Sequence, residues 1–373
     1  MRNKILFIII FSVLAVKSEH LFISVLSDKK ISSVIITSSV GEYEIINDNQ
    51  KISDLNPLSI LNISVLNKKI LLRNMADTIG IYDSLFINSL DSVNVLELKA
   101  INKTKFNRYY DDNLIITVKD GSLFFINNVD INKYVAGVVK SEGGYNKHIE
   151  YYKVQAIICR TYALREKEKH IDEKFQLCDM VHCQVYAGKS RDSLINKAVD
   201  ETRNLVLVDK NNNLISAVFH SNSGGQTLNS EDVWQESRPY LKAVVDTFSY
   251  NQKNSKWEKT IPFKSWNNYI YKKYRCSIND TCFKFIQENR INYIYIDSTK
   301  ISLKDVRKDW DLKSTFFSIK QINSDTLLFE GKGYGHGVGL AQEGAMNMAN
   351  YGYDYKTIIN FYYNNVSIIK LAN

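Results

Sequence analysis

Short apolar runs separated by polar residues dominate the first third of the chain. From Leu21 to about Asp120, runs of Ile, Val, Leu and Phe alternate with Asn, Asp, Ser and Gly, as in the segments that begin at Val34, Tyr43 and Leu114. Such runs at short spacing are typical of β-strands joined by turns. The pattern therefore predicts a β-rich N-terminal region.

Helical periodicity replaces the strand pattern near Asn132. Residues 151–165 carry apolar side chains at helical spacing without a helix breaker, which predicts a helix. This change of pattern favours an α+β fold with antiparallel sheet and flanking helices. The later elements expected are a β-rich stretch over 205–245, a helix at 263–274, strands at 293–296 and 326–329, and helices at 341–351 and 355–363.

The first eighteen residues have the composition of a signal peptide. Arg2 and Lys4 precede an apolar run from Ile5 to Leu14, and small residues at Ala15 or Ser18 would allow cleavage. The run is too short to cross a bilayer comfortably, and no later stretch is long enough. We expect an exported protein of the periplasm or cell envelope, without a membrane span.

Composition and charge restrict the class of partner. The 373 residues are 45% hydrophobic and 24% charged, as in folded globular proteins. The formal net charge is +8, and the excess suits an anionic cell-envelope polymer. Its even spread along the chain argues against a nucleic-acid partner.

The five cysteines fall into separate groups. Cys276 and Cys282 bracket a short polar loop and are the natural disulfide pair in an exported protein. Cys159 lies within the apolar helical pattern and is expected to be a buried thiol. Cys178 and Cys183, which are close to two histidines, form the third group.

These two cysteines, together with His170 and His182, form a candidate metal site. Thiolate and imidazole are the ligands that zinc prefers, although the spacing is not that of a standard zinc finger. The alternatives are a Cys178–Cys183 disulfide or two free thiols. If zinc binds, we expect a structural role, because no vacant position with a nearby base is evident.

Glycines occupy alternate positions from Gly331 to Gly339. Such a backbone can adopt positive φ and lets another group approach closely. It matches neither the Walker phosphate loop nor the dinucleotide-binding fingerprint. The loop is either a glycine-rich hairpin or part of a binding or catalytic site, and in the second case His336 is the prominent side chain.

Six segments, in this order, resemble the SpoIID/LytB family of sporulation and cell-division wall proteins. The resemblance extends weakly over the whole mature chain and strongly from about residue 105 to residue 365. The segments are Tyr134–Glu142, Gln155–Ala163, Cys178–Tyr186, Phe219–Thr227, Ser230–Trp234 and the glycine loop.

This resemblance implies a domain division and a function. It implies a β-rich region over 19–104 packed against a SpoIID-type catalytic domain over 105–373, with an insertion or subdomain at 250–325. Family enzymes are lytic transglycosylases that cleave peptidoglycan glycan strands stripped of their peptides. LytB-type members instead activate a cell-wall amidase, so a glycan-binding activator is the alternative.

The resemblance places the catalytic acid at Glu142. A lytic transglycosylase needs only one such acid, whereas ordinary glycosidases use two carboxylates. Gly143 and Gly144 stand where family members commonly carry side chains, which changes the expected shape of the groove. The resemblance also implies zinc at the Cys/His group, and we expect a substrate-binding set of Arg160, Tyr162, His220, Ser221, Gly224, Gly225, Thr227, Tyr334, His336 and Gln342.

His220 and Ser221 also suggest a nucleophile and its base, with Glu231 or Asp232 as the orienting acid. The serine does not lie in a Gly-x-Ser-x-Gly elbow. A groove wall that hydrogen-bonds sugar hydroxyls is therefore the better interpretation. Trp234 either stacks on a sugar or belongs to the core.

Overall fold

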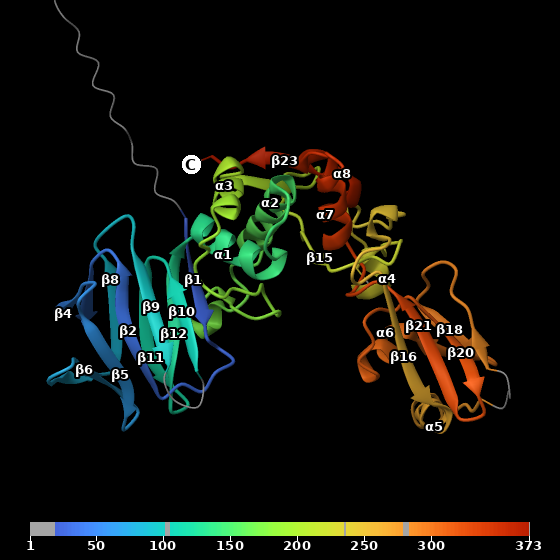
Figure 1. Ribbon diagram of the computed structural model, residues 1–373, viewed down its shortest axis with the longest axis horizontal. Helices are drawn as coiled ribbons and strands as arrows, with labels where there is room; N and C mark the ends of the chain where they lie inside the picture. The colour runs from blue at the N-terminus through green and yellow to red at the C-terminus, as the bar shows by residue number, and fades with distance from the viewer. Residues whose placement is uncertain (1–18, 101–104, 235, 279–282, 373) are drawn as a thin grey trace, which may run out of the picture.

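The computed structural model describes residues 19–100, 105–234, 236–278 and 283–372. Figure 1 shows a β-sandwich at one end, a group of helices in the middle and a mixed subdomain at the other end. The α+β fold is confirmed, since the named strands pair antiparallel except in two short pairs. The predicted signal peptide and Cys282 lie outside the described residues.

The N-terminal part consists of two sheets whose inner faces share one hydrophobic core. Along the strand 33–40, Val34, Ile36 and Ser38 are buried, so alternate residues face inward as the sequence pattern predicts. One sheet contains, in spatial order, β13 (Leu177–Cys178), β1 (His20–Val25), β12 (Ser122–Asp130), β11 (Asn113–Lys119), β8 (Ser84–Ser89), β3 (Tyr43–Asn47) and β4 (Gln50–Leu55). The other contains β10 (Phe106–Tyr110), β9 (Val95–Ala100), β2 (Ser33–Val40), β5 (Ile60–Leu66), β6 (Lys69–Arg73) and β7 (Thr78–Tyr82).

The sandwich continues past the expected boundary at residue 104. β10 forms the edge of one sheet, and β11 and β12 form the middle of the other. Apart from the short strand β13, the sandwich therefore ends at Asp130, the N-cap of the first helix. β12 pairs with β1, the first strand, so sheet pairing sets this boundary. The boundary therefore differs from the one implied by the family resemblance.

The middle part is built around one buried helix. α2 packs against the four other helices of this part, and side chains on all its sides are buried. A helix buried all round is typical of the centre of a domain. The helices are α1 (Ile131–Gly143), α2 (Ile149–Arg165), α3 (Ser193–Glu201), α7 (Gln342–Asn350) and α8 (Tyr355–Tyr362). Two short ladders join β14 (Leu205–Val208) to β23 (Ser367–Lys370) and β15 (Phe219–His220) to β22 (Leu340–Ala341).

The expected β-rich stretch over 205–245 is mostly irregular. Among its described residues, only β14 and β15 form strands, together with the short helix α4 (Ser230–Trp234). The apolar residues Ile215, Leu228 and Leu241 are buried nonetheless, so they serve the core from loops rather than from strands. Two further turns are 3₁₀-helical, at Ile171–Glu173 and Thr247–Ser249.

The subdomain spans residues 256–332 and has its own hydrophobic core, which includes Trp266 and Phe329. The expected limits of this part were 250–325. The structure gives 256–332, because the first and last strands of the subdomain pair with each other. Its main sheet contains β16 (Lys256–Pro262), β21 (Thr326–Lys332), β20 (Phe317–Asn323) and β17 (Lys284–Phe285). It also contains the hairpin β18 (Tyr293–Ile296)–β19 (Thr299–Ser302) and the helices α5 (Phe263–Tyr274) and α6 (Leu303–Asp309).

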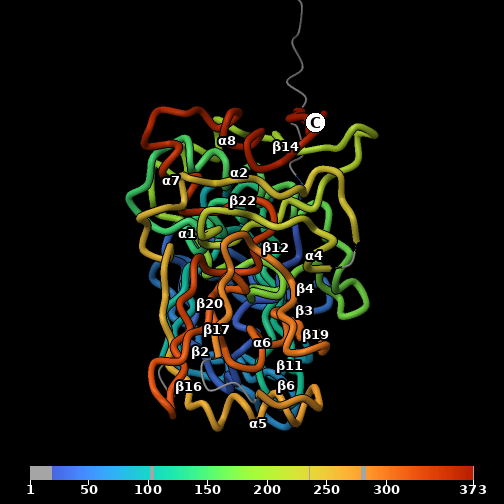
Figure 2. Tube along the Cα trace, turned by 90° about the vertical axis from the view of Figure 1, so that its right-hand side faces the viewer, coloured from blue at the N-terminus to red at the C-terminus, as the bar shows by residue number. Residues whose placement is uncertain are grey.

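The sandwich and the subdomain extend from the helices toward the same side of the molecule. Figure 1 shows them at opposite ends, and in Figure 2 the subdomain lies in front of the sandwich with α7 and α8 above both. Among the described residues, no helix has the length and apolar character needed to span a membrane.

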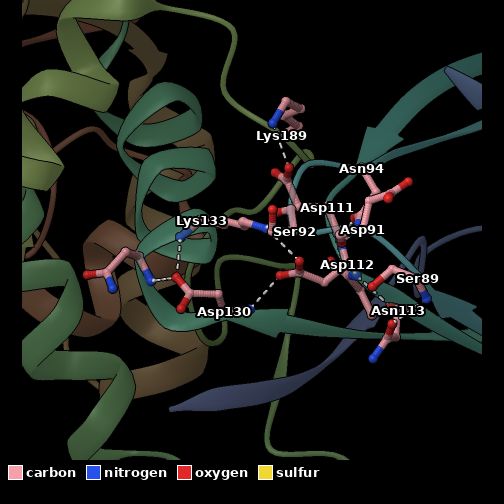
Figure 3. Close-up of polar contacts among 12 residues, drawn as sticks. Ser89, Asp91, Ser92, Asn94, Asp111, Asp112, Asn113, Asp130, Lys133 and Lys189 are labelled. Carbon is pink, nitrogen blue, oxygen red and sulfur yellow. Dashed lines mark hydrogen bonds and ion pairs between the residues drawn. The ribbon is translucent and has the colours of Figure 1, made fainter. Parts of the chain in front are cut away.

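A polar junction joins the sandwich to α1 (Figure 3). Asp130 caps α1 by accepting hydrogen bonds from two backbone N–H groups of the first turn. Lys133 pairs with Asp112 at 2.6 Å, and Lys189 pairs with Asp111 at 2.5 Å. The Asp130 N–H also donates to Asp112 at 2.9 Å. The nearly buried Asp112 thus fixes the start of α1 on the sandwich, and Asp111 holds the loop that carries Lys189.

Replacing Lys133 by Met should destabilise the protein, because Asp112 would stay nearly buried without its cation. We expect a loss of about 1–3 kcal/mol in the free energy of unfolding, toward the lower end because the Lys133 side chain is 33% exposed. Urea denaturation measures the change. The double variant Lys133→Met/Asp112→Asn should recover part of it, and equal losses in both variants would contradict this account.

Candidate active site and metal cluster

The apolar face of α1 leads directly to Glu142. Buried side chains follow helical spacing at Tyr134, Val135, Val138 and Val139. Continuing this spacing by three or four residues gives position 142, which carries a carboxylate instead of a hydrophobic side chain. Glu142 therefore lies at the end of a buried stripe, one residue before the helix ends.

The surroundings of Glu142 favour its protonated form. Burial raises the pKa of the carboxyl group, and one hydrogen bond from the Val185 N–H, at 2.8 Å, opposes that shift. The Gln342 side chain donates to the Glu142 backbone carbonyl at 3.1 Å, which joins the end of α1 to the start of α7. Of the expected substrate-binding residues, Gln342 is thus placed beside the acid.

The two glycines after Glu142 differ in their structural roles. Gly144 caps the helix at φ +72°, a conformation that favours glycine. A Cβ at Gly143 would make only ordinary contacts, at 3.6 Å, with Val139 and Tyr151. Backbone conformation therefore explains Gly144, and nothing in the structure requires glycine at 143.

The Cys/His group converges as the sequence predicts. One ligand atom from each of His170, Cys178, His182 and Cys183 lies within 4.8 Å of the others. The Cys183 Sγ is 3.5 Å from His170 Nε2 and 3.8 Å from His182 Nδ1, and the Cys178 Sγ is 3.9 Å from His182 Nδ1. Both thiols are free, so these cysteines do not form a disulfide.

These four side chains fit a zinc ion. Tetrahedral zinc with sulfur and nitrogen ligands has ligand–ligand separations of about 3.4–3.8 Å, close to those of the cluster. The Nδ1 of His170 is 2.7 Å from a Glu173 carboxylate oxygen, which leaves Nε2 facing the thiols. Such an outer carboxylate is typical of metal-binding histidines.

Arg160 does not lie in a substrate groove, contrary to expectation. It is 1% exposed, and its guanidinium donates to the backbone carbonyls of Thr202 and Leu205 at 2.9 and 3.1 Å. It also reaches Asn132 near the start of α1, at the opposite end from Glu142. Arg160 therefore stabilises the segment that follows α3.

Tyr162 lies beside the Cys/His group rather than beside Glu142. Its hydroxyl accepts a hydrogen bond from Lys169 Nζ at 3.4 Å, and the same ammonium donates to the His182 carbonyl at 2.6 Å. Tyr162 therefore contributes to the loop that carries the cluster.

His220 and Ser221 do not form a nucleophile–base pair with a carboxylate. The His220 ring faces the Val338 carbonyl through Nδ1 at 3.2 Å, and its buried Nε2 has no partner in the described residues. Ser221 Oγ accepts from the Asn254 amide at 3.2 Å. Glu231 pairs with Lys242 instead, at 2.6 Å. The geometry excludes a serine-hydrolase triad at these residues.

The glycine loop lies directly on neighbouring groups. At Gly339 (φ +69°) a Cβ would come within 2.2 Å of the Val218 carbonyl oxygen. At Gly337 (φ +86°) it would come within 2.4 Å of the Arg290 guanidinium. Close packing and positive φ therefore account for these two glycines, although the loop does not form a hairpin, because β21 pairs with β16 and β20 while β22 pairs with β15.

His336 fastens this loop. Its Nε2 donates to the Phe219 carbonyl at 2.9 Å, and its Nδ1 accepts from the Val338 N–H at 3.1 Å. Burial lowers the pKa of His336 to about 4, so the ring is neutral at physiological pH. Trp234, which is 42% exposed, lies with its ring 5.2 Å from that of His336.

The remaining expected binding residues separate into buried and exposed positions. Gly224, Gly225 and Thr227 are buried, and the Thr227 hydroxyl accepts from the Val244 N–H at 2.8 Å. They therefore shape a loop and do not face substrate. Tyr334 is 45% exposed and remains available for binding.

Two residues of this region were not singled out by the sequence. Glu343 accepts hydrogen bonds from the side chains of Asn222 and Asn254 at 2.7 Å, and it joins the middle part to the segment that enters the subdomain. Arg290 is 6% exposed and donates to the Ser223 and Gln226 carbonyls. The glycine at 337 was the signal that a large group approaches there.

Comparisons with known proteins agree with this geometry. A family model described as SpoIID, stage II sporulation protein, matches residues 119–208. The chain is 30% identical to stage II sporulation protein D of Bacillus amyloliquefaciens over 262 residues, which cover 65% of this chain and 75% of that protein. The chain belongs to the SpoIID family.

Two further relatives differ in what their names state. An uncharacterised protein of Brachyspira hyodysenteriae is 31% identical over 272 residues, which cover 70% of this chain and 72% of the relative. The amidase enhancer of Bacillus subtilis strain 168 is 29% identical over 282 residues, or 61% of this chain and 39% of that longer protein. The SpoIID family thus includes proteins named for two different roles.

Substituting Ala at Gly337 should destabilise the protein more than the same change at Gly352. Both glycines have φ near +86° to +89°, but a Cβ at Gly352 would have no heavy atom within 4 Å. Gly352→Ala should lose about 1–2 kcal/mol from backbone strain alone, and crowding against Arg290 should add about 1–3 kcal/mol at Gly337. Equal losses in urea denaturation would show that the Arg290 contact is unimportant.

Proposed function

We propose that this protein is an exported peptidoglycan lytic transglycosylase that uses Glu142 as its acid and base. The observation that carries the proposal is the carboxyl group at the end of the buried face of α1, with a pKa raised by burial. The SpoIID family membership supports a cell-wall substrate. The bond to be cleaved joins N-acetylmuramic acid to N-acetylglucosamine.

The reaction requires two proton transfers at one carboxyl group. Protonated Glu142 gives its proton to the glycosidic oxygen as the C1–O bond breaks. The resulting carboxylate then takes the proton from the C6 hydroxyl of the same muramic acid residue while O6 bonds to C1. The products are a 1,6-anhydro sugar and a free hydroxyl on the departing sugar, and no water is consumed.

Two other carboxylates of the middle part are already engaged, which supports the assignment of both steps to Glu142. Glu343 already accepts three hydrogen bonds from Asn222 and Asn254. Glu231 is held by Lys242. Both therefore have roles in the scaffold, whereas the carboxylate of Glu142 accepts a single backbone hydrogen bond. One acid that serves twice is the simplest assignment.

Glu142→Gln should abolish release of anhydro-muramic products from peptide-free glycan strands. The amide keeps the shape but cannot donate the required proton, and general acid–base catalysis contributes roughly 10²- to 10⁴-fold. Mass spectrometry of digested strands measures the products. Glycan binding should survive, and Glu231→Gln should cost much less activity than Glu142→Gln if one acid serves both steps. In the wild-type protein, kcat/KM should fall as pH rises through the raised pKa of Glu142, because the proton donor is then lost.

Other results would contradict the proposal. A free reducing sugar end, with a second carboxylate equally essential, would indicate a conventional muramidase. No cleavage by the wild-type protein, together with stimulation of a cell-wall amidase, would support the activator function. The similarity to an amidase enhancer is the observation that favours this second candidate.

We also propose that the Cys/His cluster binds one structural zinc ion. His170, Cys178, His182 and Cys183 would hold it, and their side-chain spacing supports a closed four-ligand site. A closed site supplies folding stability rather than a reactive water. The loop after Cys183 would be stabilised most, since it provides the Val185 N–H that holds Glu142.

Metal analysis of the purified protein should find about one zinc per chain. The variant Cys178→Ser/Cys183→Ser should lose the metal and melt at a lower temperature, because metal binding is coupled to folding. Cys276→Ser is the matched control, since Cys276 lies in the subdomain and outside the cluster, and it should retain zinc. A metal-free protein with a mapped Cys178–Cys183 disulfide would disprove the proposal.

A further inference from the structure

A cavity between α4 and α6 is lined by two cationic residues that form no ion pair with the described residues. Its volume is about 290 Å³, and its lining includes Lys304, Arg307 and His336. Figure 1 shows α4 where the middle part meets the subdomain, with α6 next to it. The cavity therefore lies between the residues that follow β15 and the subdomain.

Arg307 has most of its hydrogen-bonding capacity unused. Its Nε donates to the Leu312 carbonyl at 3.3 Å. Its two Nη groups have no hydrogen bond or ion pair with any part of the chain that the structure describes. Asp311 and Tyr334 favour the charged form, but burial outweighs them and lowers the pKa of Arg307. A planar guanidinium with free Nη groups is well suited to bind a carboxylate.

Three carboxylates also line the cavity. Glu231 pairs with Lys242 at 2.6 Å. Asp305 lies 3.8 Å from Lys273, which pairs more closely with Asp309, at 2.5 Å. Asp232 accepts a hydrogen bond from the neutral Asn292.

None of these carboxylates pairs with the two cationic residues of the lining. Lys304 Nζ donates to the Val233 carbonyl at 2.7 Å, and neither Lys304 nor Arg307 forms an ion pair within the part of the chain that the structure describes. The guanidinium of Arg307 is therefore available to a carboxylate of a ligand.

Two exposed aromatic rings lie at this cavity. Tyr293 lines the cavity and is 41% exposed, and Trp234 lies against His336 with 42% of its surface exposed. Exposed tyrosine and tryptophan rings offer flat apolar faces next to polar groups. The lining also includes Thr315, whose hydroxyl is shielded and has no partner among the described residues. Rings, a hydroxyl and a free guanidinium together suit a sugar that carries a carboxylate.

We propose that this cavity is a subsite for a carboxylate-bearing sugar of the glycan strand, with Arg307 binding the carboxylate. The inference rests on the proposed function, because N-acetylmuramic acid carries a lactyl carboxylate that is free only where no stem peptide is attached. His336 and Gln342 are six residues apart, which limits their separation to about 20 Å. Gln342 touches Glu142, so the subsite lies a few sugars from the scissile bond.

The test measures glycan binding to proteins that also carry Glu142→Gln, which prevents cleavage. The probes are peptide-free hexasaccharides of alternating N-acetylglucosamine and N-acetylmuramic acid, the same hexasaccharides with amidated lactyl groups, and chitohexaose, which lacks lactyl groups. Calorimetry should show that Arg307→Gln weakens binding of the acidic glycan about 10- to 100-fold. Binding of chitohexaose and of the amidated glycan should not change.

Controls separate a charge effect from a folding defect. Arg73→Gln, on the exposed end of β6, should bind like the parent protein. Arg307→Lys should retain part of the preference for the acidic glycan, because it keeps the charge but loses the planar fork. The parent protein should bind the acidic glycan more tightly than the amidated one. This comparison requires no Arg307 variant.

Two results would overturn the subsite: equal binding of acidic and amidated glycans by the parent protein, or equal weakening of all three probes by Arg307→Gln. Either result is independent of the reaction proposed for Glu142. If the wild-type protein bound acidic glycan selectively but released no anhydro sugar, the enzymatic function would fail and the subsite would stand.

Discussion

The burial of one face of α1 is the constraint on which the candidate site depends. The same spacing that buries Val135 and Val139 brings position 142 to the edge of the core. A carboxylate there loses part of its hydration, and desolvation raises its pKa. The sandwich and α2 hold α1 from two sides. The acid is thus prepared by packing rather than by a charged neighbour.

One loop connects the Cys/His cluster to this helix. After Cys183, Gln184 accepts a hydrogen bond from the Tyr134 hydroxyl, the Val185 N–H donates to Glu142, and the Ala187 N–H donates to the Ser141 hydroxyl. These contacts run along α1, so the loop cannot move without disturbing the acid. A metal ion in the cluster would affect Glu142 only through this loop, by fixing the position of the Val185 N–H.

The sequence was most informative where periodicity was strong or motifs were long. The strands of the sandwich, the helices near 151–165 and 263–274, and the convergence of the four Cys/His residues all follow from patterns that burial or ligand chemistry requires. The stretch 205–245 was expected to be β-rich, but most of its apolar residues serve the core from irregular backbone. Arg160 was misjudged because a motif shows that a residue matters without showing that it faces solvent.

Glu142 and the cavity lined by Arg307 come from different parts of the chain. Glu142 and the cluster lie within residues 130–187, a contiguous segment that packs on the sandwich. The cavity with Arg307 forms where the subdomain packs on the glycine loop. There the Arg290 guanidinium packs directly against Gly337, which has no Cβ. The glycines that resemble a binding motif therefore allow close packing. They let the subdomain approach closely enough to place positive charge beside the middle part of the protein.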